Sequence, residues 1–244
     1  MKNYGLKTYQ KPKIKQTVPA NIISQTCYNI LMQTYRKLFH NYLEDKLKLQ
    51  PYQKLGIIFL LVVISGFFGW VYEFIFYYFN GGMQEWYMQG GNFLPWINIY
   101  AIGGLLILFT TYKFKKYPLA VFFIAFFATG ILELVAGWLV YTLGHGTRYW
   151  DYNTEILNFG NIGGFVCLRS VLFFGISALF LMYAIVPFCI FLSQKLSRRA
   201  FLILAITLFS LVMLDEFGNL AAKILGLPTA MDFYRSLGLH YMNA

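Results

Sequence analysis

The sequence predicts an all-α protein: a polytopic bundle of transmembrane helices, with about five spans, preceded by a basic amphipathic arm. Hydrophobic residues make up 58% of the 244 residues, and only 12% are charged. Soluble domains carry about twice that share of charge, so lipid has to cover the surplus of apolar surface. Five long apolar runs also follow one another, each about as long as or longer than the roughly 20 residues that a membrane helix needs.

The predicted spans are separated by short loops whose charge alternates from one loop to the next. The apolar runs are 55–79, 94–112, 118–143, 161–192 and 200–225. Basic clusters follow the second and fourth runs: Lys113, Lys115 and Lys116, then Lys195, Arg198 and Arg199. The positive-inside rule therefore predicts a multi-pass plasma-membrane protein with a cytoplasmic N-terminus and an extracytoplasmic C-terminus. Within the fourth run, Pro187 is expected to end or kink the helix.

The first 54 residues carry ten basic and only two acidic side chains. A basic segment before a membrane span is attracted to anionic lipid, and this explanation is favoured over nucleic-acid binding. Apolar residues at helical spacing predict an interfacial helix over 20–50, although a solvated or partner-binding helix fits the same pattern. The chain thus divides into a cytoplasmic arm (1–50), a transmembrane domain (51–225) and a short extracytoplasmic tail (226–244).

An internal repeat is visible in the transmembrane domain. A glutamate lies late in the first and third runs, at Glu73 and Glu133. A Gly-Asn pair stands at the start of the second run and of the fourth, at Gly91 and Gly160. Tyr100 lies nine residues beyond the first glycine, and Arg169 lies nine residues beyond the second. This spacing predicts two parallel two-helix units, 55–112 and 118–192, followed by a fifth span. Chance similarity between two apolar hairpins is the alternative.

Charged side chains inside the spans are costly in lipid, so they are expected to face the bundle interior. At about 1.5 Å per residue, Glu73, Glu133 and Arg169 fall in the outer half of the bilayer. We therefore expect one polar cavity that opens outward, with Arg169 as the counter-ion of Glu73 or Glu133. An ion pair that only holds helices together is the alternative. Asp215 and Glu216 lie at a similar depth and receive no role.

The loop after the third span is rich in aromatic and charged side chains, including Arg148, Trp150 and Asp151. These residues fit either an interfacial aromatic belt or the mouth of the expected cavity. The predicted substrate-binding residues are therefore Glu73, Tyr100, Glu133, Arg148, Trp150, Asp151 and Arg169.

Several chemical signatures do not occur in the sequence. It contains no P-loop, no His-Glu-x-x-His motif and no Gly-x-Ser-x-Gly motif. The three cysteines and three histidines lack the spacing of a metal site. We accordingly predict no catalytic residue, no metal ligand and no cofactor, and an enzymatic activity is not favoured.

Five short motifs occur in an order that resembles a known family. They are Gly69-Trp70-x-x-Glu73, Tyr100-x-x-Gly103, Glu133-x-x-x-Gly137, Trp150-Asp151-Tyr152 and Cys167-Leu168-Arg169. Together they are similar to the type IV ABC-transporter permease family, the CmpB-like membrane proteins, over about residues 55–195. The resemblance implies a transport function and a separate ATPase subunit. Membrane lipids and further copies of the chain are other expected partners, and nucleic acid is not.

Three functions remain open from the sequence. The favoured one is a permease-like protein that moves a small polar or amphiphilic solute through the outward-facing cavity. A non-catalytic membrane scaffold or assembly factor is the second. The third is a membrane-embedded enzyme acting on lipid head groups, in which Glu73 and Glu133 are acid and base and Arg169 holds a phosphate.

Overall fold

The computed structural model describes residues 20–80, 87–88, 91–238 and 240–241. The lysines of residues 1–19 therefore lie outside the described residues. In order, the helices are α1 (Ala20–Leu43), α2 (Pro51–Asn80), α3 (Asn98–Thr111), α4 (Pro118–Leu143), α5 (Leu168–Phe180), α6 (Val186–Lys195), α7 (Arg198–Ile224) and α8 (Ala230–Ser236). A 3₁₀ turn, η1 (Tyr112–Phe114), follows α3, and a π-helical turn, η2 (Leu181–Ile185), joins α5 to α6.

Within the described part of the chain, four helices are long and apolar enough to cross a membrane. They cover Pro51–Phe79, Pro118–Leu143, Leu168–Lys195 and Arg198–Ile224. The remaining predicted span, 94–112, contains α3, which has only 14 residues. At about 1.5 Å per residue, α3 is roughly 21 Å long, shorter than the hydrocarbon core. The all-α fold is confirmed, and the number of five spans is approximate.

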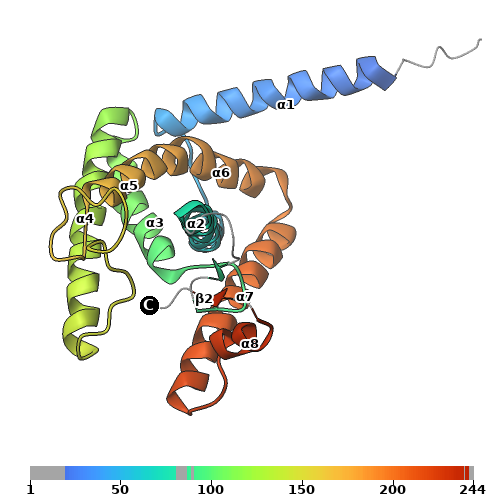
Figure 1. Cartoon of the computed structure of the whole chain (residues 1–244). Coiled ribbons are helices and arrows are strands. Elements are labelled where there is room, and N and C mark those ends of the chain that lie inside the picture. Colours follow the sequence, from blue (N-terminus) through green and yellow to red (C-terminus); the bar gives the residue numbers. More distant parts are fainter. Residues whose placement is uncertain (1–19, 81–86, 89–90, 239, 242–244) are drawn as a thin grey trace, which may run out of the picture.

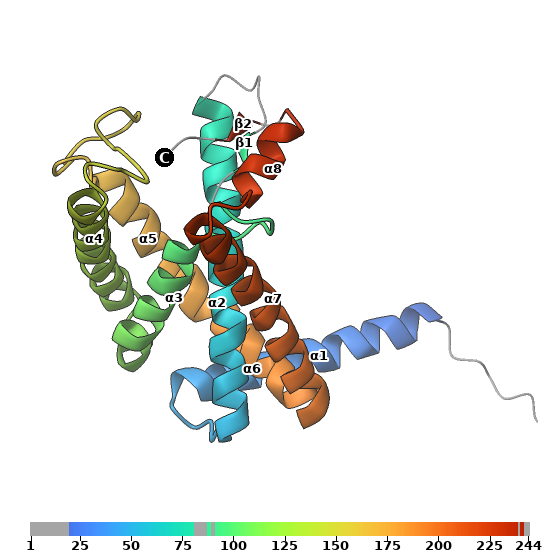
Figure 2. The same ribbon diagram turned by 90° about the horizontal axis from the view of Figure 1, so that it is seen from below.

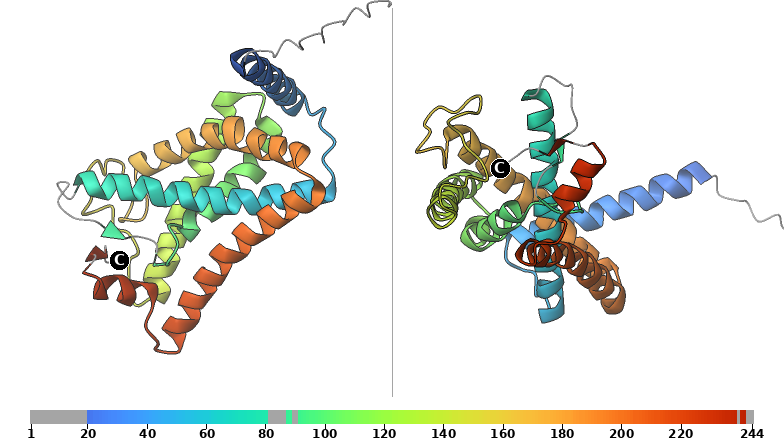
Figure 3. Two further views of the ribbon diagram at one scale, coloured as in Figure 1. Left: turned by 90° about the vertical axis from the view of Figure 1, so that its right-hand side faces the viewer. Right: turned by 60° about the horizontal axis from the view of Figure 1, so that its bottom comes forward.

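The long helix α2 lies at the centre of the bundle. Figure 1 views it nearly end-on, with α3 and α4 on one side and α6 and α7 on the other. Leu60 and Leu61 of α2 belong to the main apolar core, together with Ile107 of α3 and Ile190 of α6. On another side of α2, the ring of Phe59 stacks on Phe209 of α7, which is tilted relative to α2 (Figure 3).

The two ends of α2 carry different structures. At one end α1 runs across the bundle, roughly perpendicular to α2 (Figure 2). At the other end lie the loop between α4 and α5, helix α8, and a two-residue parallel strand pair formed by β1 (Tyr87–Met88) and β2 (His240–Tyr241). We call these the α1 end and the α8 end.

Helix α1 confirms the helix expected after residue 20, and it ends at Leu43. Its last turns are packed into the protein, since Leu38 and Tyr42 belong to the main core. At the start of α6, Pro187 does not end the fourth span. The π turn η2 ends at Ile185, two residues before Pro187, and α6 continues to Lys195. A proline has no backbone N–H to donate and its ring crowds the preceding turn, and the π turn accommodates both effects without ending the helix.

Candidate functional site

Glu133 of α4 is a buried acidic side chain within one of the spans. It is 5% exposed. Its two carboxyl oxygens accept hydrogen bonds from the Tyr152 hydroxyl at 2.8 Å and the Ser170 hydroxyl at 2.6 Å. Burial, and then the neighbouring Glu133 carboxyl, raise the pKa of Tyr152 well above its ordinary value, so its phenol keeps its proton and donates. A helix, a loop and the start of another helix thus meet at one carboxyl group.

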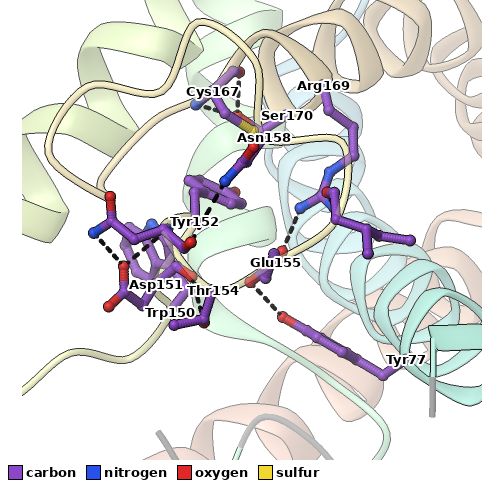
Figure 4. A network of polar contacts seen from close by, with 12 residues as sticks. Tyr77, Trp150, Asp151, Tyr152, Thr154, Glu155, Asn158, Cys167, Arg169 and Ser170 are labelled. Carbon is purple, nitrogen blue, oxygen red and sulfur yellow. Dashed lines mark hydrogen bonds and ion pairs between the residues drawn. The ribbon is translucent and has the colours of Figure 1, made fainter.

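Arg169, in the first turn of α5, is held at the side of the bundle facing the loop. Its guanidinium donates to the Glu155 carboxylate and, at 2.8 Å, to the backbone oxygen of Ile156. It also lies over the ring of Phe76, 4.1 Å from the ring centre. Glu155 accepts a further bond from the Tyr77 hydroxyl of α2 at 3.0 Å, so the acid bridges two spans (Figure 4).

This arrangement corrects the expected partner of Arg169. The sequence placed Arg169 opposite Glu73 or Glu133, but its salt bridge is with Glu155. The physical reason is the loop, which folds back beneath the start of α5 and brings Glu155 next to the guanidinium (Figure 4). Glu133 obtains its hydrogen bonds from neutral hydroxyl groups instead.

Glu73 and Tyr100 lie together between α2 and α3. The Tyr100 hydroxyl lies close enough to the Glu73 carboxyl for the two groups to interact electrostatically. One turn before Glu73, Gly69 makes this contact possible, because a Cβ there would collide with the ring of Tyr100. Tyr100 also stacks on Phe174 of α5, with ring centres 5.5 Å apart. Glu73 and Glu133 therefore each face a hydroxyl on the next helix along the chain.

Arg148, Trp150 and Asp151 shape the loop between α4 and α5. Arg148 donates to the Gly163 oxygen at 2.9 Å and lies 3.6 Å from the Asp151 carboxylate. Trp150 donates to the Phe165 oxygen at 2.9 Å. Gly164 has φ of +81°, and a Cβ there would collide with Arg148 and Asp151. The three predicted residues thus close the loop on itself and bring Tyr152 to Glu133.

Sequence reasoning placed neither Tyr152 nor Glu155 among the site residues. Tyr152 had a signal, because it completes the Trp-Asp-Tyr motif. Glu155 had none beyond its charge, since only the fold of the loop carries it to Arg169.

Asp215 and Glu216 of α7 bind the segment that leads into α3. The Asp215 carboxylate accepts the backbone N–H groups of Phe93 at 3.0 Å and Leu94 at 2.6 Å. Glu216 accepts the side-chain amides of Asn92 and Asn98, each at 2.8 Å. These acids therefore fasten α7 to the start of α3, and they do not reach the Glu133 or Arg169 clusters through any hydrogen bond that the described residues make.

Two cavities lie beside these clusters, and both are lined mainly by apolar side chains. One, of about 300 Å³, lies between α2, α3 and α5 and includes Ser65 and Tyr100 in its wall. The other, of about 380 Å³, is lined by Tyr72, Ile75, Phe76, Phe79 and Ile156. Among the described residues, no group of three or more His, Cys, Asp or Glu side chains is arranged to hold a metal ion.

Comparison with known families identifies the architecture. Residues 59–219 match the family described as "Putative ABC-transporter type IV". The chain belongs to this family. No curated protein and no solved structure matches it. The matched range extends from α2 to α7, so the Glu133 and Glu73 clusters, the intervening loop and the Asp215 contacts all lie within the family region. The family and the apolar helices are together consistent with a multi-pass, permease-like membrane protein.

Proposed function

We propose that this member of the ABC-transporter type IV family is the membrane component of a transporter for a small polar or amphiphilic solute. The observation that carries the proposal is the Glu133 carboxyl, which is 5% exposed within a membrane-spanning helix. A polar group there is costly in lipid, and such residues commonly mark solute or ion pathways. Glu73, Tyr100, Arg148, Trp150, Asp151 and Arg169 complete the proposed binding region in the outer half of the bilayer.

The proposed orientation places the α1 end in the cytoplasm and the α8 end outside. Lys113, Lys115 and Lys116 follow α3, whereas Lys195 ends α6 and Arg198 begins α7. Both basic clusters are thus at the α1 end, as the positive-inside rule requires for a plasma-membrane protein. Since the sequence contains no P-loop, a separate ATPase subunit would supply ATP hydrolysis.

A scaffold function is the second candidate, and a specific observation favours it. The Glu133 carboxyl receives two hydroxyl donors, and Arg169 is paired with Glu155. These internal contacts give both Glu133 carboxyl oxygens and both terminal nitrogens of Arg169 a partner without any solute, although Arg169 Nε has none. A protein in which they only join helices would need them for folding, and for nothing else.

Glu133→Gln separates the two functions. The amide keeps the side-chain shape and one oxygen acceptor, and both hydroxyl partners can accept as well as donate. We expect the variant to reach normal membrane abundance but to lose transport, measured by comparing solutes inside cells and in the medium for a deletion strain carrying each variant. Glu44→Gln at the exposed α1 end is the matched control. Full transport by Glu133→Gln would contradict the proposal.

The ATPase partner is tested separately. A tagged chain purified in mild detergent is expected to bring down an ATPase, detected by phosphate release from ATP. If no ATPase copurifies and the deletion strain takes up and exports the same solutes as the parent, the transporter proposal fails.

A further inference from the structure

The apolar stripe of α1 continues past the edge of the bundle. On one side of this helix, Leu38 is 5% exposed and Tyr42 is 1% exposed, because both pack into the main core. One turn earlier, Tyr35 still reaches the bundle through an edge-on contact with the ring of Phe191 in α6. A further turn back, Leu31 is 51% exposed. The first half of α1 extends beyond the other helices, as Figures 1 and 2 show.

The stripe is turned toward the bilayer. Leu31, Tyr35 and Leu38 are separated by four and three residues, so they lie on one side of the helix. Because α1 lies across one end of the membrane-spanning helices, the side that contacts them is the side that faces the lipid. Leu31 points the same way as Leu38 but has no helix beneath it. Hydrocarbon would therefore continue at Leu31 the apolar contact that the bundle makes with Leu38.

The other side of α1 is polar and basic. Gln33, Arg36, Lys37 and His40 are all exposed. Neither Arg36 nor Lys37 forms a salt bridge with any residue that the structure describes. An apolar stripe facing the bilayer, with basic side chains on the other side, is the arrangement of a helix that lies in the membrane interface. Arginine and lysine side chains can extend from such a helix to the phosphate groups.

The rest of the α1 end adds positive charge that no acid of the described chain neutralises. Glu44 already pairs with Lys116, and Asp45 pairs with Lys115. Other basic side chains at this end are exposed and form no salt bridge with a described residue, among them Arg36, Lys37, Lys46, Lys48, Lys54 and Lys195. This charge attracts anionic lipid. An acidic protein that approached from the cytoplasm would meet the charge too, but it would leave the apolar stripe uncovered on the opposite side of α1.

We propose that α1 is an interfacial helix that binds anionic phospholipid of the cytoplasmic leaflet, with Leu31 in the hydrocarbon and Arg36 and Lys37 at the phosphate groups. Since Leu38 and Tyr42 tie the same helix to the bundle, the lipid contact would fix the depth of the α1 end in the membrane. This inference goes beyond the proposed transport function and does not depend on it.

The test uses the purified full-length protein in lipid nanodiscs, in which the buffer reaches both faces of the bilayer. Cys167 and Cys189 are buried, so in a Cys27→Ser chain a thiol-reactive fluorophore labels an introduced cysteine. Leu31→Cys and Gln33→Cys form a matched pair, because both positions are exposed and lie about 200° apart around the helix. Lipid brominated on its chains quenches a fluorophore in the hydrocarbon, whereas iodide quenches one in water.

We expect brominated lipid to quench the label at Leu31→Cys and iodide to quench the label at Gln33→Cys. In discs with equal amounts of phosphatidylglycerol and phosphatidylcholine, bromine on the anionic lipid should quench Leu31→Cys more strongly. Arg36→Gln combined with Lys37→Gln should lower this enrichment of anionic lipid, by up to about 5-fold for each charge removed. Lys223→Gln, at an exposed lysine in the last turn of α7, is the matched control and should leave the enrichment unchanged. Added salt should lower the enrichment without any charge substitution.

Quenching of Leu31→Cys by iodide and not by brominated lipid would overturn the proposal, because the stripe would then face water. Protection of this label from both quenchers would overturn it too, since protein, such as a second copy of the chain, would then cover the stripe. Equal quenching by the two lipids at every salt concentration would also overturn it, even if the double charge variant failed to fold. The discs contain no ATPase and no solute, so none of these outcomes bears on the transport function.

Discussion

Arg169 and Glu155 form a salt bridge across the loop that joins α4 to α5. The side chains are 14% and 9% exposed. Glu155 also accepts the Tyr77 hydroxyl of α2, while Arg169 reaches the backbone of Ile156 and the ring of Phe76. The pair therefore connects the loop, α5 and α2 at a single point. Removing either charge would leave the other nearly buried and unpaired.

Arg169→Ala should destabilise the protein by about 3–5 kcal/mol, because it leaves the Glu155 carboxylate without its cation. The double variant Arg169→Ala with Glu155→Gln should recover a substantial part of this loss, since no uncompensated charge remains. Thermal unfolding of the purified protein in detergent measures both. A double variant as unstable as Arg169→Ala would show that the ion pair is not the source of the effect.

Arg148 provides the control for a more exposed arginine in the same loop. Its contact with Asp151 is 3.6 Å, and the side chains are 25% and 31% exposed. We expect the loss of this ion pair alone, in Asp151→Asn, to cost less than about 1 kcal/mol. A cost equal to that of Arg169→Ala would argue that any charge removed from the loop unfolds it.

Tyr152→Phe tests the hydroxyl that reaches Glu133 from the loop. The bond is 2.8 Å long, and the variant keeps the ring while removing the donor. Leaving a buried acceptor without its donor costs about 1–3 kcal/mol, so the expected loss of stability is in that range. Ser170→Ala should have a comparable effect, because it removes the other donor. A negligible change in unfolding temperature for both variants would show that the two hydrogen bonds to Glu133 do not stabilise the protein.

Composition and charge carried the prediction of the fold. Apolar runs located α2, α4, the joined α5 and α6, and α7, since a helix in lipid must satisfy its own backbone. They did not give the length of α3. Its preceding segment is held by hydrogen bonds to Asp215 and Glu216 in place of helical bonds, and those acids are more than 100 residues away in sequence.

The candidate site was predictable only in part. The cost of charge in lipid pointed to Glu73 and Glu133, and motif spacing pointed to Tyr100. The partner of Arg169 was wrong because side-chain pairing in the loop depends on its turns, including Gly163 and Gly164 at positive φ. Sequence spacing does not reveal which way such a loop folds back.

Asp215→Ala should release the segment before α3. Two backbone N–H groups, of Phe93 and Leu94, would lose their acceptor. We expect faster hydrogen–deuterium exchange at these two amides, by roughly 10-fold or more if each bond contributes about 1.5 kcal/mol or more. Glu216→Gln should leave them protected, since Glu216 bonds the side chains of Asn92 and Asn98 instead. Unchanged exchange in Asp215→Ala would mean that the segment is held by packing alone.

Lys115 fixes the end of α1 to the transmembrane bundle. Its side chain is 1% exposed and pairs with Asp45, which follows α1. Its ammonium group also lies 4.0 Å from the ring centre of Tyr112 and 5.4 Å from that of Tyr42. The adjacent Lys116 makes a different contact, 3.3 Å from Glu44, with side chains 42% and 40% exposed. The two neighbouring lysines therefore offer a matched comparison of a buried and an exposed ion pair.

Lys115→Ala should loosen α1 from the bundle, whereas Lys116→Ala should not. The first variant removes an ion pair and two cation–π contacts and leaves a space beneath Tyr42; the second removes an exposed pair that contributes at most about 1 kcal/mol. Asp45 is 62% exposed, so water can solvate it after the change, and we expect the bundle itself to stay folded. Limited proteolysis between α1 and α2 should therefore accelerate in Lys115→Ala at an unchanged unfolding temperature of the core. Equal cleavage rates in the two variants would show that the apolar contacts of Leu38 and Tyr42 hold α1 without the Lys115–Asp45 ion pair.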